Sequence, residues 1–480
     1  MQLFKIIIGI ILISLFTACG SNKENNVDAP PEAVKDPITK DIADIKAEGV
    51  LRALTTYSGT SYFLYRGKAM GFEYELLERF AEYLGVELEI IVTSNIDSLV
   101  KKLNDGEVDL IAHTLTITSE RKKKVNFTDY LYLTNQVLVQ KKPDNWRNMK
   151  WNKVEKTLVH DAIELIDDTV SVRKNTSYFQ RLNNLSSEIG GEIIIDTLSG
   201  SLATDEIIKM VVDGDIKYTI ADKNIASINA SYYPILDIDV PISFSQRIAW
   251  AVRSNSPNLL VAANEWLKEF KKEVDYNVIF NKYFKNTRAF KARIKSDFYS
   301  LNNNKISKYD EIIKKNAAII EWDWRLLASL IYQESQFDPH AKSWAGAHGL
   351  MQIMPATAKE LGVKDRSNPE QVIQGGAKYL KMLYDRFDMV EDSVQRIKFS
   401  MASYNCGYGH VTDAQNLAEK RGIDQNIWDD HIDNIILELS YPKNYNDPVV
   451  KYGYVRGTEP YNYVVNIFDR YDHYKKFIEK

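Results

Sequence analysis

The sequence predicts a multidomain protein in which a two-lobed α/β domain is followed by a mostly α-helical domain. The chain has 480 residues, more than one hydrophobic core usually holds, so two or three domains are expected. Between about residues 48 and 287, short β-rich runs alternate with helical stretches, which is typical of an α/β domain with largely parallel sheets. From about residue 306 the β signal fades, and helical periodicity interrupted by Gly, Pro and Asn replaces it.

The bulk composition fits a folded protein and argues against a nucleic-acid binder. Hydrophobic residues make up 45% of the chain and charged residues 26%, which is ordinary for a globular protein. The formal net charge is −4, and the 61 basic and 65 acidic residues are well mixed along the chain. Nucleic-acid-binding domains carry a concentrated basic patch instead, so no nucleic-acid partner is expected.

The first 19 residues predict a secretory signal that ends in a lipid-attachment site. Lys5 precedes an apolar run over 6–16 that is too short to span a bilayer comfortably, and small residues follow before Cys19. The segment resembles a bacterial lipobox, whose cysteine becomes the lipidated first residue, although Phe16 stands where leucine is usual. An uncleaved N-terminal anchor helix is the alternative. In both cases the chain lies in the cell envelope, and we expect a lipid anchor in the outer membrane facing the periplasm.

The two cysteines, Cys19 and Cys406, predict no disulfide framework, because lipidation of the first leaves the second without a partner. The 7 His residues show no paired Cys/His spacing, so we expect neither a metal site nor a cofactor.

The domain boundaries follow from changes in composition. Residues 20–45 are polar and contain prolines, which predicts a flexible tether. A stretch over 285–304 is basic and then rich in asparagine, so the first domain is expected over 46–290 and the second over 305–480.

Within the first domain, the most regular helix is expected over 72–84, where apolar residues keep a 3.6-residue stripe that ends at Gly85. Seven β-rich runs predict strands. They fall at 86–92, 108–115, 135–139, 169–172, 193–195, 218–221 and 248–252.

Glu334 is the strongest candidate for a catalytic acid. It shares the apolar face of a helix expected over 324–334 with Leu327 and Leu330, and it lies in the last turn because Pro339 soon stops the helix. Burial and the helix C-terminus both disfavour the ionised form, so this glutamate is expected to keep its proton towards neutral pH, as a general acid must. The alternative is a glutamate that bends to solvent at a helix end.

Three further segments carry small, polar and aromatic residues that suit a neutral sugar. The segment 335–355 places hydrogen-bonding side chains among glycines, which let a backbone approach a ligand closely. The segments 402–407 and 459–464 each contain a Tyr and an Asn. The candidate substrate-binding residues are Ser335, Gln352, Tyr404, Asn405 and Tyr463.

Four ordered motifs resemble the signatures of the lysozyme-like lytic transglycosylases of the soluble type. They are Glu334-Ser335, Gly349-Leu350-Met351-Gln352, Ser403-Tyr404-Asn405 and Tyr463-Val464. The one departure is Ser403, where the family usually has alanine.

The resemblance implies a lysozyme-like fold and a peptidoglycan substrate, cut between N-acetylmuramic acid (MurNAc) and N-acetylglucosamine (GlcNAc). Glu334 would act first as acid and then as base, and the C6 hydroxyl of the sugar would close a 1,6-anhydro ring. Asn405 and Tyr463 are expected near the reacting sugar, and Ser335 and Gln352 are expected to position it or merely to order loops. A non-enzymatic wall-binding receptor and a goose-type lysozyme-like hydrolase are the alternatives.

The first domain resembles the periplasmic amino-acid-binding proteins of solute-binding family 3. The strongest local match spans 116–130, and 213–222 resembles the second-lobe strand that ends in an acid. By that resemblance Arg121 and Asp222 hold the two ends of an amino acid or short peptide, since an arginine suits a carboxylate. A lobe pair without ligand, or a docking surface, is the alternative.

The order of parts across nearly the whole chain resembles the membrane-bound lytic murein transglycosylases of the F type. It suggests that an amino acid or muropeptide in the first domain regulates cutting by the second.

Overall fold

The computed structural model describes residues 37–93, 98–301 and 304–479. The predicted signal peptide, the lipidation residue Cys19 and most of the predicted tether lie outside the described residues. Over the described ranges, none of the helices combines the length and the apolar character needed to cross a membrane.

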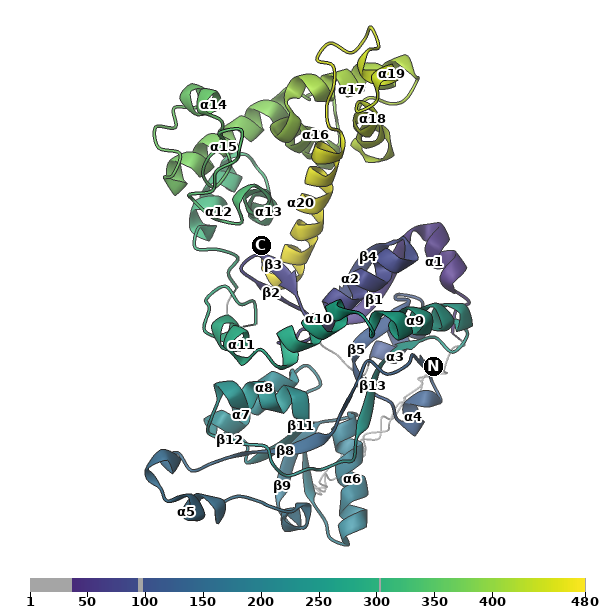
Figure 1. Ribbon diagram of the computed structural model, residues 1–480, viewed down its shortest axis with the longest axis vertical. Coiled ribbons are helices and arrows are strands. Elements are labelled where there is room, and N and C mark those ends of the chain that lie inside the picture. The colour runs from purple at the N-terminus through teal and green to yellow at the C-terminus, as the bar shows by residue number, and fades with distance from the viewer. Residues whose placement is uncertain (1–36, 94–97, 302–303, 480) are drawn as a thin grey trace, which may run out of the picture. The chain divides into compact units, whose positions relative to one another are not determined.

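The first lobe is built on a six-stranded sheet (Figure 1). Its order is β4-β1-β5-β13-β6, and β7 pairs with β13. The strands are β1 (Val50–Thr55), β4 (Glu87–Val92), β5 (Leu110–Thr116), β6 (Asn126–Phe127), β7 (Tyr132–Thr134) and β13 (Gln246–Val252). The helices of this lobe are α1 (Ile42–Glu48), α2 (Phe72–Leu84), α3 (Leu99–Asn104), α4 (Ser119–Lys122), α9 (Pro257–Phe270) and α10 (Val274–Phe284). A separate hairpin is formed by β2 (Phe63–Tyr65) and β3 (Lys68–Met70).

The second lobe contains a three-stranded sheet, a parallel strand pair and its own helices. The strands are β8 (Gln136–Lys141), β9 (Thr169–Arg173), β10 (Ile194–Leu198), β11 (Tyr218–Asp222) and β12 (Leu236–Asp237). The helices are the short η2 (Trp146–Asn148) and η3 (Ala162–Leu165) with α5 (Trp151–Glu155), α6 (Ser177–Ile189), α7 (Thr204–Asp213) and α8 (Lys223–Tyr232). One face of this lobe has a core of its own, whereas β8, α7, β11, α8 and β12 also contribute residues to the core that they share with the first lobe.

The α/β prediction is confirmed, with one difference in strand direction. Each of the seven β-rich runs contains or overlaps a strand, and the helix 72–84 forms as α2 and ends at Gly85 in the left-handed region. However, β13 runs antiparallel to β5, and β8 runs antiparallel to β11. The chain passes from β7 directly into β8 and returns through β13, so these connecting strands do not follow the parallel pattern of β1, β4 and β5.

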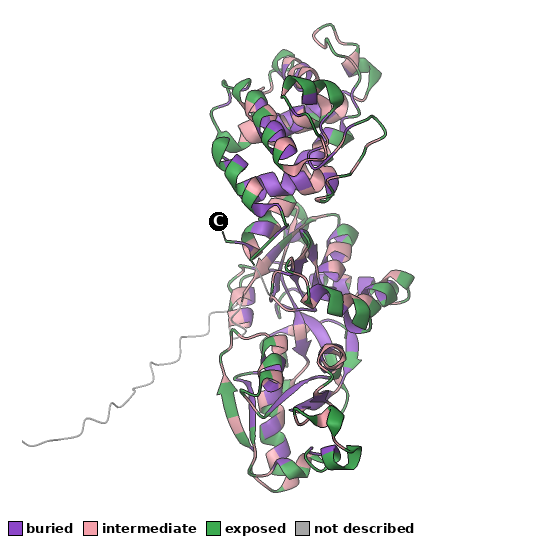
Figure 2. Ribbon diagram, turned by 90° about the vertical axis from the view of Figure 1, so that its left-hand side faces the viewer, coloured by how far each residue is buried: buried purple, intermediate pink, exposed green. Residues whose placement is uncertain are grey.

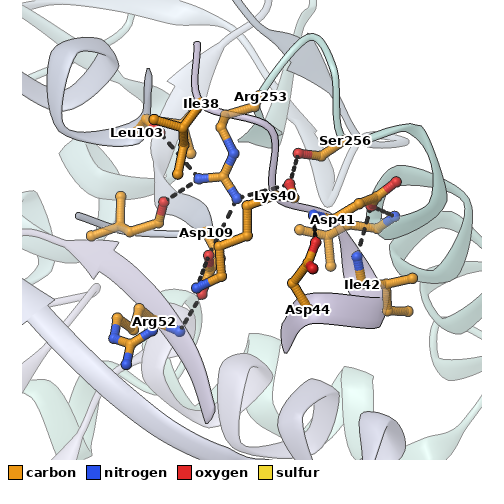
Figure 3. Close-up of polar contacts among 12 residues, drawn as sticks. Ile38, Lys40, Asp41, Ile42, Asp44, Arg52, Leu103, Asp109, Arg253 and Ser256 are labelled. Carbon is orange, nitrogen blue, oxygen red and sulfur yellow. Dashed lines mark hydrogen bonds and ion pairs between the residues drawn. The ribbon is translucent and has the colours of Figure 1, made fainter. Parts of the chain in front are cut away.

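The end of the predicted tether belongs to the first lobe, which corrects the expected boundary at residue 45. The side chain of Asp41 caps α1, and Ile45 is fully buried. Figure 3 shows how the preceding backbone is fixed: the buried Arg253 guanidinium donates to the Lys40 carbonyl at 3.2 Å and to Asp109 at 3.2 Å. A helix of seven residues is too short to be read from periodicity, because its stability comes from these distant contacts.

The C-terminal domain is mostly helical, as predicted, and its helices turn one buried face inward and an exposed face outward (Figure 2). It follows α11 (Thr287–Ile294) and a short connection. Its helices are α12 (Asp310–Ile319), α13 (Trp324–Ser335), α14 (Pro355–Glu360), α15 (Pro369–Asp385), α16 (Ser393–Cys406), α17 (Tyr408–Lys420), the π-helical η4 (Trp428–Ile432), α18 (Asp433–Glu438), α19 (Pro442–Tyr445) and α20 (Thr458–Phe477). The long helix α20 packs against both α13 and α16.

The far end of α20 contacts the first lobe. The Tyr474 hydroxyl donates to the carbonyl of Gly67, in the turn of the β2–β3 hairpin, at 2.9 Å. The Phe477 ring lies against Tyr57 and Tyr62, with ring centroids 4.7 and 4.8 Å apart. One helix therefore joins the core of the helical domain to the binding-protein-like domain.

Candidate active site

Glu334 lies in the last turn of α13, where the sequence predicts it. The helix begins at the side chain of Asp323, which accepts from the Arg325 backbone, and it ends as Gln336 turns into the left-handed region. Phe337 also has a positive φ of 63°. Two consecutive non-glycine residues in this region are uncommon, and such backbone strain concentrates at functional sites.

Burial raises the pKa of Glu334 to about 7, and an interaction with the Tyr463 hydroxyl lowers it by a smaller amount. The Tyr463 hydroxyl donates a hydrogen bond to Glu334 Oε1. The carboxyl group is surrounded by protein, yet the residue keeps part of its surface exposed. The carboxyl group is therefore partly protonated at neutral pH, which a general acid requires.

Helix α20 positions Tyr463 by packing on α13. The Ser329 hydroxyl of α13 donates to the Ile467 carbonyl of α20 at 2.7 Å. In the other direction, Arg470 donates to the Ser329 carbonyl and to Gln333 Oε1 at 3.3 and 3.1 Å. Because these bonds lie within two turns of Tyr463 and next to Glu334, they hold the two side chains together.

The remaining motif residues surround this pair through the loop 338–354. The Tyr404 hydroxyl donates to the Met351 carbonyl at 2.7 Å, and its pKa is raised by burial first and then by the nearby Glu334 charge. Asn405 follows on α16 and is exposed. The structure thus brings the motifs together at the end of α13.

Ser335 and Gln352 bind the loop backbone. The Ser335 hydroxyl donates to the Leu350 carbonyl at 2.8 Å, and Gln352 Nε2 donates to the carbonyls of Ala341 and Gly349 at 3.0 and 2.9 Å. These contacts favour the loop-ordering role that the sequence left open for both residues. Their contact with substrate stays a prediction.

The backbone at position 349 of this loop requires a glycine. Its φ is +85°, and a Cβ atom there would lie 1.9 Å from the Arg366 carbonyl oxygen. Any side chain at this position would push the loop away from Arg366.

A second acid suited to glycosidic chemistry is not apparent beside Glu334. Asp338, the next acid along the chain, accepts from the His340 backbone at 2.9 Å and so stabilises a turn. In the part of the chain that the structure describes, no other carboxylate perturbs the pKa of Glu334. Over the same ranges, no group of three His, Cys, Asp or Glu side chains is arranged to hold a metal ion.

In the binding-protein-like domain, the predicted ligand residues Arg121 and Asp222 lie near each other but are already engaged. The Arg121 guanidinium donates to the Thr116 carbonyl at 3.0 Å and favours the charged form of Asp222. Asp222 is 1% exposed, and burial raises its pKa to about 7. The hydroxyl of Tyr178, a residue that the sequence did not single out, interacts with the Asp222 carboxyl group.

The domain contains a cavity of about 600 Å³ that neither Arg121 nor Asp222 lines. Arg173, at the carboxyl end of β9, and Asp205, in the first turn of α7, contribute charges to its wall. An arginine at the end of a strand was the available sequence signal for this site, since ligands of α/β sheets bind beyond the carboxyl ends of strands. A second, polar hollow of about 410 Å³ is lined by Thr116 and Ser177 among others.

Comparison with known proteins matches each half of the chain to a protein family. Residues 51–286 match the model of bacterial extracellular solute-binding proteins, family 3, and residues 311–427 match the transglycosylase SLT domain. A relative from Desulfosudis oleivorans named membrane-bound lytic murein transglycosylase F is 36% identical over 428 residues, which cover 89% of this chain and 90% of the relative. The chain belongs to the membrane-bound lytic murein transglycosylase F family, a family of peptidoglycan lytic transglycosylases. A relative of the same name from Shewanella woodyi is 33% identical over 98% of this chain and 91% of its own.

Among solved structures, the chain is similar to the P235GK mutant of ArgBP from T. maritima, with 26% identity and a TM-score of 0.43. The match covers 51% of this chain and 99% of that protein.

Proposed function

We propose that this family member cleaves the β-1,4 bond between MurNAc and GlcNAc of peptidoglycan and leaves 1,6-anhydro-MurNAc ends. The observation that carries the proposal is the environment of Glu334: its carboxyl group has a pKa near 7, accepts from Tyr463 and is influenced by no other carboxylate of the described residues. Most glycosidases that use water or a protein nucleophile employ two carboxyl groups. A single carboxyl group suits a reaction in which the substrate supplies its own nucleophile.

The proposed reaction begins with proton transfer from Glu334 to the glycosidic oxygen. The GlcNAc unit leaves as the alcohol, and the N-acetyl group of MurNAc stabilises the cationic C1 centre. Glu334, now a carboxylate, removes the proton from the C6 hydroxyl of MurNAc, whose oxygen bonds to C1 and closes the 1,6-anhydro ring. The carboxyl group ends the cycle protonated, so no water is consumed.

Tyr463 and the Tyr404–Asn405 pair have distinct proposed roles. The Tyr463 hydroxyl donates to the carboxylate that forms after the first proton transfer, which stabilises the base of the second step. Tyr404 fixes the Met351 carbonyl beside the site, and the proposed partner of the exposed Asn405 is the acetamido group.

Product analysis tests this chemistry. Purified peptidoglycan is digested with residues 20–480 and, in parallel, with the Glu334→Gln variant, and the products are identified by mass spectrometry. Anhydro-muropeptides from the parent and none from the variant are expected. Reducing ends would indicate a goose-type hydrolase, and no products from either protein would favour a wall-binding receptor.

We also propose that the first domain senses an amino acid or muropeptide and regulates cutting. The contact of α20 with the first lobe supports this, because the helix that carries Tyr463 also carries Tyr474 and Phe477, which touch Gly67 and Tyr57. Tyr57 in turn lines the cavity. Addition of muropeptides is expected to change both lobe closure, followed by small-angle scattering, and the cutting rate. If neither changes, the sensing role is wrong.

Lipidation of Cys19 and an outer-membrane location complete the proposal, since the relatives are named membrane-bound. Metabolic labelling with palmitate is expected to mark the parent and not Cys19→Ser, and only the labelled protein is expected to sediment with outer-membrane vesicles. An unlabelled parent would favour the uncleaved anchor.

A further inference from the structure

The loop after α13 contains a hairpin over 341–349 whose base is fixed beside the candidate catalytic site. The Gly349 backbone donates to the Ala341 carbonyl at 3.0 Å. Gln352 Nε2 binds the carbonyl oxygens of the same two residues at 2.9 and 3.0 Å. Ser335, which directly follows the catalytic glutamate, donates to the carbonyl of the residue after Gly349 at 2.8 Å. The base of the hairpin therefore lies next to the end of α13.

The tip of this hairpin is stabilised by its own hydrogen bonds. The Ser343 backbone donates to the Ala347 carbonyl, and the Ala347 backbone donates to Ser343 Oγ, each at 3.0 Å. The Gly346 backbone donates to the Ser343 carbonyl at 3.1 Å. From outside the hairpin, the Arg366 guanidinium donates to the Gly346 carbonyl at 2.8 Å. These bonds give the turn an ordered backbone.

Trp344 lies in this turn and is 100% exposed. Single exposed apolar residues are common on protein surfaces, so exposure alone does not indicate a binding site. Here, however, the indole projects from a hydrogen-bonded turn of the loop that surrounds the catalytic motifs. Tryptophan contributes strongly to binding when a ligand covers it, because it offers a large apolar area together with one N–H donor. A substrate group that covers Trp344 is therefore bound favourably.

Cationic side chains gather around the same hairpin. Lys342 is exposed, and Arg366 donates to the hairpin backbone. Among the described residues, neither of these two cations takes part in an ion pair. His348 lies across the hairpin from Lys342. Burial first, and then the charges of Lys342, Arg366 and His340, lower the pKa of this histidine, so these positive charges lie close together.

The nearby acids stabilise turns. Asp338 accepts from the His340 backbone at 2.9 Å, and Asp365 accepts from the Ser367 backbone at 2.8 Å. Of the charges that act on the imidazole of the hairpin, that of Asp365 has the smallest effect. The hairpin surface is therefore positive on balance and attracts carboxylates.

The chemistry of peptidoglycan indicates which of its parts fits this surface. The sugars are neutral where the lactyl group of MurNAc is amide-linked to its stem peptide. The stem peptide itself carries free carboxyl groups and apolar side chains. An exposed indole next to cations therefore complements the stem peptide better than the sugar backbone.

We propose that the 341–349 hairpin recognises the stem peptide of the strand being cut, with Trp344 packed on the peptide and Lys342 paired with one of its carboxylates. Both are positioning residues, and they make the chain prefer peptide-bearing strands to denuded ones. This inference rests on the proposed reaction at Glu334 and adds a specificity to it.

Three matched substrates test the proposal. Soluble glycan strands keep their stem peptides, keep stems whose amino groups are acetylated and carboxyl groups amidated, or lose their stems to an amidase. The release of anhydro ends by the full-length protein gives kcat and KM on each substrate. The lowest KM is expected on strands with unmodified stems.

Trp344→Ala is expected to raise KM on peptide-bearing strands about tenfold and to leave kcat unchanged. On denuded strands its KM is expected to stay within about twofold of the parent. Trp344→Phe keeps an aromatic ring and is expected to restore most of the affinity. Because the indole is fully exposed, thermal unfolding of both variants is expected to match that of the parent.

Lys342→Gln is expected to raise KM about threefold on strands with unmodified stems, the effect of losing one exposed ion pair. No change is expected on amidated stems, and the threefold effect is expected to vanish at high salt. Lys359→Gln is the matched control, since Lys359 is exposed in α14 outside the hairpin and its loss is expected to change neither KM nor kcat.

Two results would overturn the proposal. Equal KM values of the parent on all three substrates would show that stem peptides are not recognised. A preference for peptide-bearing strands that survives Trp344→Ala combined with Lys342→Gln would place the recognition elsewhere, for example in the first domain.

Retention of the same strands by the Glu334→Gln protein separates this inference from the proposed reaction. If the parent forms no anhydro ends, the reaction is wrong, but weaker retention of peptide-bearing strands by Trp344→Ala in the Glu334→Gln background would still support the hairpin. If anhydro ends form and Trp344→Ala changes neither KM nor retention, the reaction stands and the hairpin assignment is wrong.

Discussion

Glu334 in the helical domain and Glu73 in the first lobe are both buried carboxyl groups, and burial raises the pKa of each to about 7. Each also has one neutral donor: the Tyr463 hydroxyl bonds Glu334, and the Trp250 indole bonds Glu73 at 2.6 Å. The two residues differ in how much of their surface is exposed. Glu73 is 0% exposed beneath the core of the first lobe, whereas Glu334 keeps exposed surface at the end of its helix.

The comparison shows that a raised pKa alone does not identify a functional group. Perturbed pKa values cluster at active sites, but buried structural carboxyl groups share them. The proposed chemistry is therefore assigned to Glu334 because its raised pKa is combined with partial exposure of the residue and with the motif residues around it. Glu73 is expected to contribute to the stability of the first lobe.

The largest expected effect separates the two glutamates directly. Glu334→Gln removes the proton donor and is expected to lower cutting by at least about 1,000-fold, within the range of general acid–base catalysis. Glu73→Gln keeps a similar shape and is expected to leave cutting within about twofold. Release of soluble muropeptides from peptidoglycan measures both variants, and comparable losses would contradict the distinction.

The pH dependence of stability is expected to show the structural role of Glu73. Its pKa is about 7 when folded and near the ordinary value of 4.5 when unfolded, so the folded state retains the proton over this interval. The free energy of unfolding therefore decreases as pH rises from 4.5 to 7, by up to about 3 kcal/mol from this group. Urea unfolding at pH 5 and pH 8 is expected to show a smaller decrease for Glu73→Gln than for the parent. Equal decreases would mean that Glu73 is not buried as described.

The loop beside Glu334 is expected to tolerate substitution unevenly. Gly349→Ala places a Cβ atom 1.9 Å from the Arg366 carbonyl, whereas Gly346→Ala, at a similar φ of +92°, meets open space. The first is expected to cost about 2 kcal/mol more of unfolding free energy than the second. It is also expected to reduce cutting, because this loop receives the Ser335 hydroxyl. Thermal unfolding of the pair gives the difference, and equal stabilities would refute the close approach.

The smallest expected effect concerns Tyr463. Its interaction lowers the pKa of Glu334, so Tyr463→Phe is expected to raise that pKa further. Cutting requires the protonated acid at the start, and the alkaline limb of the pH–rate profile is therefore expected to move to higher pH. The rate at pH 7 is expected to fall about tenfold, because the carboxylate loses its donor in the second step. Tyr404→Phe, whose hydroxyl bonds the Met351 carbonyl instead, is expected to leave the limb in place.

Local patterns predicted much of the fold. The stripe over 72–84 and the apolar face around Glu334 each formed the expected helix, since their spacing alone specifies a buried face. Strands β2 and β3 were missed because three residues carry no periodic signal. The correction near residue 45 has the same origin, since α1 is stabilised by distant contacts.

The two sites differ in how much of each could be predicted from the sequence. The catalytic motifs identified the surroundings of Glu334, but the side-chain bonds of Ser335 and Gln352 to the loop backbone depend on backbone positions that spacing does not specify. In the first domain, the residues Arg121 and Asp222 matched a family pattern. The neighbouring Tyr178 contacts Asp222, and its position follows only from the packing of α6 on β9.

The most direct test of the account is digestion of purified peptidoglycan in heavy-oxygen water, followed by mass spectrometry of the new glycan ends. A reaction closed by the C6 hydroxyl of the substrate is expected to give anhydro-MurNAc ends without heavy oxygen, and Glu334→Gln is expected to give none. Reducing MurNAc ends that carry one heavy oxygen would contradict the account, because water would then be the nucleophile.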